Sequence, residues 1–143
     1  MPDTLKPRDG ADVEGAVAAA LAGGKALEVL GQGSKRRIGR PAQWDTTLDL
    51  SGLSGVTLYE PAELVLSARA GTPIAEIEAL VAEHGQQLAF EPMDYGPALG
   101  EPPGRGTIGG VLAANLSGPR RIRAGAARDH FLGFTAVSGR GET

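Results

Sequence analysis

The sequence predicts an α/β domain in which helices flank a small sheet. Three observations predict this class. A helix, a strand and a glycine-rich loop follow one another early in the chain, and a strand followed by an amphipathic helix comes later. In addition, 41% of the 143 residues are apolar, which is enough to form the packed core of one domain.

The first predicted helix covers Ala11 to Leu21, and Gly23 and Gly24 end it. Its apolar stripe has a four-residue spacing and consists of Val13, Val17 and Leu21. Ala26 to Leu30 then predicts a short buried strand, which leads directly into a glycine-rich loop over Gly31 to Gly39.

Three further strands are predicted from alternating or apolar segments: Thr46 to Leu50, Val56 to Tyr59 and Leu64 to Ala70. Ser51 to Gly55 supplies a turn between the first two. A second helix is expected to have Thr72 as its N-cap and Pro73 at its first position, and to stop at Gly85. Its apolar stripe consists of Ile74, Ile77, Leu80 and Val81.

The sequence predicts little regular secondary structure in the last third of the chain. Ala89 to Arg105 is rich in proline and glycine and predicts a long loop, after which Thr107 to Asn115 predicts a short helix. Phe131 to Ser138 is expected to be a strand that enters a turn at Gly139 to Gly141. Because such a strand needs a partner and the sequence ends at Thr143, we expect the domain to be truncated at its C-terminus.

Composition argues against several classes of function. The net charge of −3 gives no bulk attraction to nucleic acid or to an anionic membrane. The absence of cysteine excludes disulfides, thiolate metal sites and a cysteine nucleophile, and suggests the reducing cytosol. The first residues have no signal-peptide pattern, and no apolar stretch approaches the roughly 18 residues of a membrane span.

The loop over Gly31 to Gly39 is the first candidate for a binding site. It combines glycines, small polar side chains and three consecutive cations after a strand, a composition that suits a nest of backbone N–H groups around a phosphate. An ordinary solvated basic turn remains the alternative. The glycine spacing matches neither a Walker loop nor a dinucleotide fingerprint of the Rossmann type.

A second candidate segment, Thr107 to Gly118, places paired glycines and small residues at a predicted helix start. Such a segment can lie flat against a planar ligand, or its glycines can simply permit close helix packing. A third segment, Arg128 to Gly133, would by itself be a surface turn before a strand. His84 and His130 are expected to be structural, and Arg120 with Arg121 to be either a phosphate or carboxylate partner or a solvated charge pair.

A set of short motifs follows in a fixed order from about Ala26 to Thr143. Its members are Gly31-Gln32-Gly33-Ser34-Lys35, Gly39-Arg40-Pro41, Tyr59-Glu60-Pro61, Ala70-Gly71-Thr72-Pro73, Glu91-Pro92, Tyr95-Gly96, Gly109-Gly110, Ser117 to Arg121, Arg128-Asp129 and Leu132-Gly133. This ordered set resembles the FAD-binding (PCMH-type) domain of the vanillyl-alcohol oxidase/p-cresol methylhydroxylase flavoprotein superfamily. Within that superfamily, the set is most similar to the FAD-binding subunits of bacterial glycolate oxidases.

The resemblance implies FAD as the cofactor, with the first loop at its pyrophosphate and the later segments along the rest of it. The implied cofactor-binding residues are Gly31, Gln32, Gly33, Ser34, Lys35, Thr107, Ile108, Gly109, Gly110, Ser117, Gly118 and Asp129. For Asp129, capping a turn is an equal alternative. Some members tether the flavin through a histidine in the first loop, where Ser34 and Lys35 stand here, so the resemblance implies non-covalent FAD.

The implied activity is oxidation of glycolate or a similar 2-hydroxy acid, with electrons passing to FAD. The alternatives are an FAD-dependent dehydrogenase of D-lactate or another 2-hydroxy acid, and a non-catalytic assembly module. The chain would be a first subdomain over about residues 1–115 and the start of a second over about 116–143, inactive in isolation and without an assignable catalytic base. Other glycolate oxidase subunits are the expected partners, in the cytoplasm or peripherally at the inner membrane.

Overall fold

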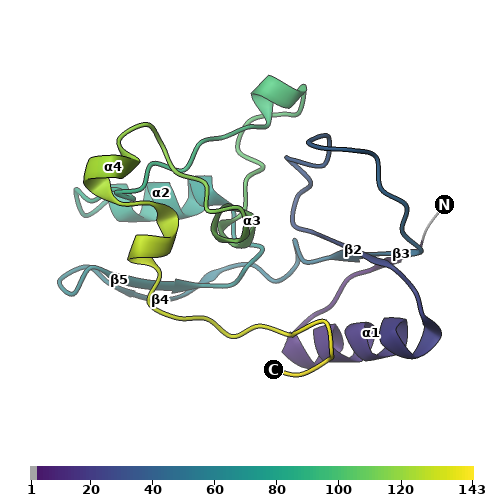
Figure 1. Ribbon diagram of the computed structural model, residues 1–143. Coiled ribbons are helices and arrows are strands. Elements are labelled where there is room, and N and C mark those ends of the chain that lie inside the picture. Colours follow the sequence, from purple (N-terminus) through teal and green to yellow (C-terminus); the bar gives the residue numbers. More distant parts are fainter. Residues whose placement is uncertain (1–2) are drawn as a thin grey trace.

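The chain forms a mixed helix and sheet structure with two small sheets, as the sequence predicts. The structure is a computed structural model, and it describes residues 3–143. The first sheet contains β1 (Asp3–Leu5), β2 (Leu27–Leu30) and β3 (Thr46–Asp49), and the second contains β4 (Val56–Glu60) and β5 (Val65–Ala68). The two sheets lie side by side in Figure 1. The first helix of the chain lies beside the first sheet, and most of the later helices lie on the side of the second sheet.

The three-stranded sheet is parallel, with β3 between β1 and β2. Leu27 pairs with Thr46 and Leu30 with Asp49, so β2 and β3 end together at one edge. The central position of β3 explains why Leu48 is only 1% exposed. Strand β1 was not predicted, because three residues near a terminus carry too short a pattern.

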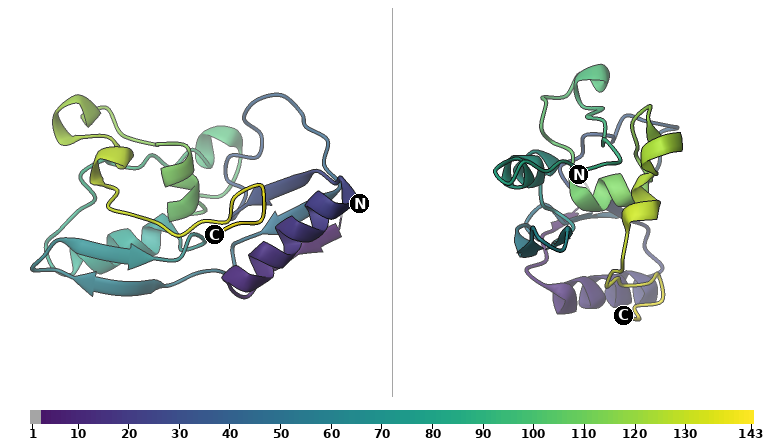
Figure 2. Two further views of the ribbon diagram at one scale, coloured as in Figure 1. Left: turned by 60° about the horizontal axis from the view of Figure 1, so that its bottom comes forward. Right: turned by 90° about the vertical axis from the view of Figure 1, so that its left-hand side faces the viewer.

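Helix α1 (Gly10–Gly23) connects β1 to β2 and lies along one face of this sheet (Figures 1 and 2). The Asp9 side chain caps it by accepting a hydrogen bond from the Asp12 N–H, and Gly24 ends it with a φ of 61°. The predicted stripe was wrong at its last position, because Leu21 is 60% exposed whereas Ala20 is buried.

The hairpin of β4 and β5 is antiparallel, and it is followed by α2 (Ile74–Ala82). The apolar stripe of α2 is confirmed, since Ile74, Ile77 and Val81 are all buried. Thr72, however, is not its N-cap. The cap residue is Pro73, and the fully buried Thr72 hydroxyl accepts from Gly55 N–H and donates to the Arg69 carbonyl, so it ties the hairpin together instead.

The long loop predicted between α2 and the next helix is present, interrupted only by a 3₁₀ turn, η1 (Pro97–Leu99). Helix α3 (Ile108–Ala113) follows, within the predicted range. Beyond it come two short helices that were not predicted, α4 (Arg121–Ala124) and the 3₁₀ helix η2 (Ala127–His130). A core made of Ile74, Phe90, Val111 and Ala127 joins α3 and η2 to α2.

The strand predicted over Phe131 to Ser138 was wrong. This segment pairs with no strand among residues 3–143 and runs without regular structure back to α1 (Figure 2), where a Cβ placed on Gly141 would lie 3.9 Å from Ala18. The predicted turn after it does form, because Gly141 N–H donates to the Ser138 carbonyl. A strand needs a hydrogen-bonded partner, and this stretch has none here.

Candidate functional site

The glycine loop begins where β2 ends, at the carboxyl edge of the parallel sheet. In open α/β sheets this edge is where ligands bind. Gly33 has a φ of 73°, and the loop turns back through hydrogen bonds from Arg36 N–H to the Gly33 carbonyl and from Ile38 N–H to the Lys35 carbonyl. Within the described part of the chain, the backbone N–H groups of residues 31–35 donate to no protein acceptor. Such a run of free donors can bind an anion.

Thr107 connects the glycine loop to the segment before α3. A Cβ placed on Gly31 would lie 2.6 Å from Thr107 Oγ1, so only glycine fits against this buried threonine. The Thr107 hydroxyl also accepts from Gly110 N–H and caps α3. Thr107 pairs in turn with Pro73 in an isolated antiparallel bridge. The structure therefore brings the first two predicted binding segments together.

The paired glycines of α3 have different neighbours. A Cβ on Gly109 would lie 2.8 Å from Ala70, which shows tight packing against the end of the hairpin. A Cβ on Gly110 would lie 3.4 Å from Lys35 Nζ. Burial lowers the pKa of Lys35, and the charge of Asp94 partly opposes this effect. Lys35 thus presents a partly desolvated cation between the glycine loop and α3.

A wide groove of about 740 Å³ opens along the glycine loop. The ends of β2 and β3, Gly31 to Gly33 and three arginines line it, together with Ser51 and Glu101. The arginines are Arg36, Arg37 and Arg105. Arg36 makes a two-pronged ion pair with Glu28 at 2.8 and 2.6 Å and lies over the Trp44 ring. This groove combines free N–H donors with guanidinium groups, which suits a phosphate-bearing ligand.

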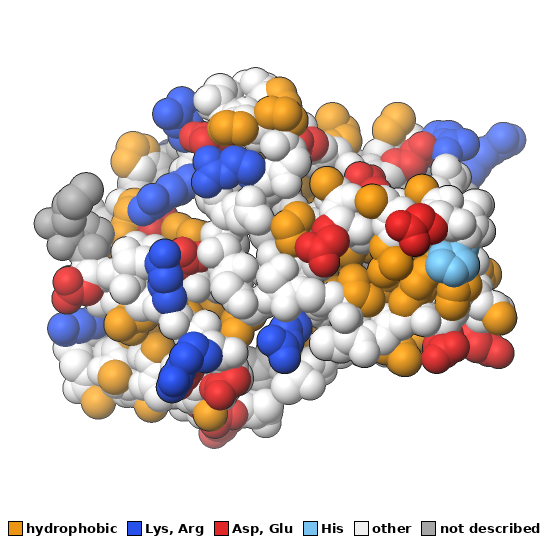
Figure 3. All heavy atoms as spheres, turned by 180° about the vertical axis from the view of Figure 1, so that it is seen from behind, with side chains coloured by type: hydrophobic (Ala, Val, Ile, Leu, Met, Phe, Trp, Pro, Cys, Tyr) orange, Lys and Arg blue, Asp and Glu red, His pale blue; other side chains and the backbone are white. Residues whose placement is uncertain are grey.

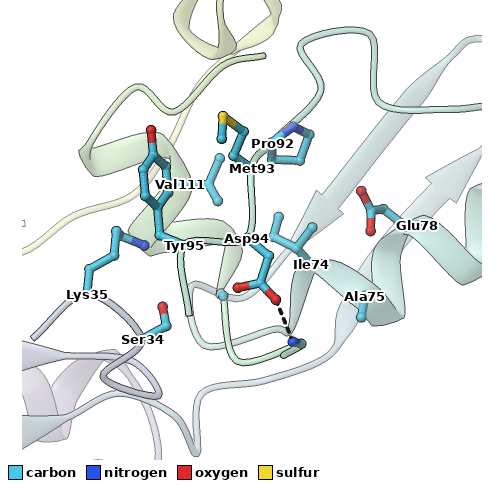
Figure 4. Close-up of a pocket in the computed structure, with 12 residues that line it drawn as sticks. Ser34, Lys35, Ile74, Ala75, Glu78, Pro92, Met93, Asp94, Tyr95 and Val111 are labelled. Atoms are coloured by element: carbon cyan, nitrogen blue, oxygen red, sulfur yellow. Dashed lines mark hydrogen bonds between the residues drawn. The ribbon is translucent and has the colours of Figure 1, made fainter. Parts of the chain in front are cut away.

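A smaller cavity of about 70 Å³ lies on the other side of Ser34 and Lys35, between them, α2 and the long loop (Figure 4). Asp94 organises its wall, because its carboxylate accepts from Gly96 N–H and Gly104 N–H at 3.0 and 2.7 Å. Burial, with a smaller contribution from the Asp94 charge, raises the pKa of Glu78 at its rim. Sequence analysis did not single out Asp94, since an isolated acidic residue in a loop carries no motif.

The segment from α4 to η2 lies on the far side of α3 from the glycine loop (Figure 1). The other predicted site residues come just before α4 or belong to η2, and they have structural partners. Ser117 Oγ accepts from Ala127 N–H at 2.9 Å. Gly118 leaves no room for a Cβ, which would lie 2.6 Å from Glu91 Cβ. Asp129 accepts from Ala126 N–H at 2.8 Å, so it has the turn-capping contact that was the alternative to a cofactor role.

The remaining titratable candidates also have local partners. His130 shares a 2.7 Å hydrogen bond with the Ala124 carbonyl, and the rings of His84 and Tyr59 form a T-shaped pair. Arg120 pairs with Glu91 at 2.7 Å, and the hydrogen bond from this guanidinium lowers the pKa of Glu91. On the face drawn in Figure 3, basic side chains lie at several separate places, with acidic and uncharged side chains between them.

Among residues 3–143, no helix has the length and apolar character needed to cross a membrane, and no group of three or more His, Cys, Asp or Glu side chains could hold a metal ion.

The fold and the glycine-loop groove have the features of a nucleotide-binding domain, and comparison with known proteins identifies its family. Residues 4–143 match the family model described as FAD binding domain. The chain belongs to this family, and FAD, the cofactor predicted from the sequence, is confirmed for it. Over 116 residues it is 40% identical to the glycolate oxidase subunit GlcE of Escherichia coli (strain K12), a match that covers 81% of this chain and 31% of that protein.

Solved structures agree on the fold. An alkyldihydroxyacetonephosphate synthase aligns with 90% of this chain and 23% of its own, at a TM-score of 0.70 and 22% identity. Phl p 4.0202, a glucose dehydrogenase, aligns with 96% of this chain and 27% of its own, at a TM-score of 0.73 and 14% identity. These likenesses confirm the predicted PCMH-type FAD-binding fold. The chain spans about a third or less of each of these proteins.

Proposed function

We propose that this chain is the FAD-binding part of a flavoprotein that oxidises glycolate or a similar 2-hydroxy acid. The observation that supports its role in binding most directly is the glycine loop, in which residues 31–35 offer free N–H groups beside the arginine-lined groove. The substrate is proposed from the likeness to the E. coli subunit, at 40% identity over most of this chain.

The residues of the loop fit FAD on two structural grounds. The free N–H groups and guanidinium groups match the negative charge of a pyrophosphate. Gly31 supplies a close approach to Thr107 that any Cβ would block, so the loop and the start of α3 form one continuous wall. We propose that Gly31 to Lys35 and Thr107 to Gly110 contact the cofactor directly. Ser117, Gly118 and Asp129 then support this wall through their contacts with Glu91 and the η2 backbone.

When bound, the flavin would take up the two electrons removed as glycolate becomes glyoxylate. The residues of this chain would bind and orient the cofactor. The base that accepts the hydroxyl proton is not among the residues assigned here, and we propose that it belongs to a part of the protein beyond this domain. From the likeness to the E. coli subunit, we also propose that the partners of this protein are other subunits of a glycolate oxidase assembly.

We also propose that FAD is held without a covalent bond. The loop position at which some superfamily members are expected to carry a tethering histidine has Ser34 and Lys35. Both histidines have structural partners elsewhere, His84 with Tyr59 and His130 with the Ala124 carbonyl. Acid precipitation of the complete protein should therefore release all flavin into the supernatant. Flavin that stays with the precipitate would contradict this arrangement.

The function is tested in the complete protein by anaerobic titration. Glycolate should bleach the absorbance of bound oxidised flavin. Faster bleaching by D-lactate would select the dehydrogenase alternative, and bound flavin that no 2-hydroxy acid reduces would indicate an assembly module. A protein that binds no FAD would overturn the proposal altogether.

A further inference from the structure

Two arginines of the groove share a single acidic partner. Arg105 Nη1 lies 3.1 Å from one carboxylate oxygen of Glu101, and Arg37 Nε lies 3.7 Å from the other. Within the described residues neither arginine pairs with any other carboxylate, whereas Arg36 is neutralised by Glu28. The cluster of Arg37, Arg105 and Glu101, which we term the arginine clamp, therefore carries a net charge of +1.

The clamp is assembled from segments far apart in the sequence. Arg37 belongs to the glycine loop, and its guanidinium also donates to the Leu99 carbonyl at 3.3 Å. Glu101 is placed by a turn in which its N–H donates to the Gly96 carbonyl. The Glu101 side chain is 23% exposed, less than those of Arg37 and Arg105, at 69% and 41%. The carboxylate thus lies between two guanidinium groups at the wall of the groove.

A carboxylate in this position offers the guanidinium groups two oxygen acceptors, as a phosphate group does, but it carries less negative charge. Guanidinium groups bind carboxylate and phosphate through the same paired N–H donors. A diphosphate carries more negative charge than one carboxylate, and residues 31–33, whose N–H groups donate to no acceptor within residues 3–143, line the same groove. A ligand diphosphate would therefore match the two arginines better than Glu101 does.

We propose that Arg37 and Arg105 bind the diphosphate of the dinucleotide, and that Glu101 occupies their guanidinium groups in the free protein and is displaced when the ligand binds. This inference rests on the proposed function for the identity of the ligand. Two ion pairs must break on binding, so Glu101 lowers the affinity for every anion. A singly charged anion binds the two arginines too weakly to displace the Glu101 carboxylate. The clamp therefore favours diphosphates over singly charged anions.

The test uses ADP as the probe, with isothermal titration calorimetry on the complete protein. Glu101→Gln should bind ADP about three- to tenfold more tightly than wild type, because the two exposed ion pairs that no longer compete are together worth about 0.7–1.4 kcal/mol. Glu63→Gln, which removes an exposed carboxylate from the β4–β5 turn, should leave the affinity unchanged. Far-UV circular dichroism and the urea midpoint check that each variant is folded.

A second pair of variants separates competition from mere loop support. Arg37→Ala combined with Arg105→Ala should weaken ADP binding, and in that background Glu101→Gln should give no further gain, because Glu101 acts only through the two arginines. Arg123→Ala, at an exposed arginine on α4, is the control. If Glu101 only holds the loop, Glu101→Gln will weaken ADP binding or leave it unchanged, and the proposal is wrong.

The outcomes also distinguish this proposal from the proposed function. FAD binding with an ADP affinity that Glu101→Gln does not raise would overturn the clamp and leave the flavoprotein assignment intact. FAD binding with no measurable ADP binding in any variant would have the same meaning. A protein that binds neither FAD nor ADP would overturn both.

Discussion

The contact between Gly31 and Thr107 gives the sharpest test of how the site is built. An alanine Cβ at position 31 would lie 2.6 Å from Thr107 Oγ1 and 2.9 Å from Thr107 Cγ2. Besides Cα, the threonine Cβ carries Oγ1, Cγ2 and one hydrogen. Because both heavy atoms face position 31, a rotation about χ1 leaves at least one of them there, so it does not remove the clash. Rotation would also break the hydrogen bond from Gly110 N–H that caps α3.

The expected cost of Gly31→Ala follows from these two effects. Overpacking a buried contact costs about 1–3 kcal/mol, and loss of a threonine N-cap costs about 1 kcal/mol. We expect Gly31→Ala to lower the free energy of unfolding by about 2–4 kcal/mol. Because the same contact joins the glycine loop to α3, the affinity for FAD should fall as well. Gly133→Ala, where a Cβ meets no atom within 4 Å, should change stability by less than about 0.5 kcal/mol.

Urea unfolding followed by circular dichroism measures these values, and a double-mutant cycle assigns them to the contact. Thr107→Ala alone should cost about 1 kcal/mol, and in that background Gly31→Ala should cost at least about 1 kcal/mol less than it does in wild type. If the two effects add within about 0.5 kcal/mol, the clash does not exist and this account of the site is wrong.

Three further predictions concern single positions. Gly33→Val should weaken FAD binding at least about tenfold, because a β-branched residue is strained at a φ of 73°, whereas Gly33→Asn should stay within a few-fold of wild type; equal affinities in a flavin fluorescence titration would show that the loop is misassigned. The hydrogen bond from Arg120 lowers the pKa of Glu91 below 4.5, so this pair adds stability above that pH and loses it as the pH falls through the lowered pKa; Arg120→Gln should flatten the acid decline of Tm, and an unchanged decline would contradict the pairing. Burial raises the pKa of Glu78, so the folded state is favoured when this carboxyl is protonated, and that contribution to stability is lost as the pH rises through the raised pKa. Glu78→Gln should therefore raise Tm at pH 7 and leave it unchanged at pH 4. Glu76→Gln, on the same helix, should not raise Tm at either pH.

The sequence alone determined most of the local structure that forms the site. The strand before Gly31, the turn-forming glycines after it, and the short helix that follows Thr107 were all predicted from residue types and spacing. Each depends on physics that acts within a few residues, such as positive φ at glycine and apolar periodicity. The resemblance carried by these motifs was enough to predict FAD and the fold, which the family match and the solved structures confirm.

Only the tertiary structure decided which distant segments meet. Thr72 was predicted to be a helix cap, yet its hydroxyl accepts a hydrogen bond from the N–H of Gly55, 17 residues away. Phe131 to Ser138 had the composition of a strand, but a strand also needs a partner, and no local pattern supplies one. Arg37 and Leu99 are 62 residues apart and become hydrogen-bonded only when the long loop folds over the glycine loop. Propensity acts between neighbours along the chain, whereas pairing, burial and ion pairs depend on neighbours in space.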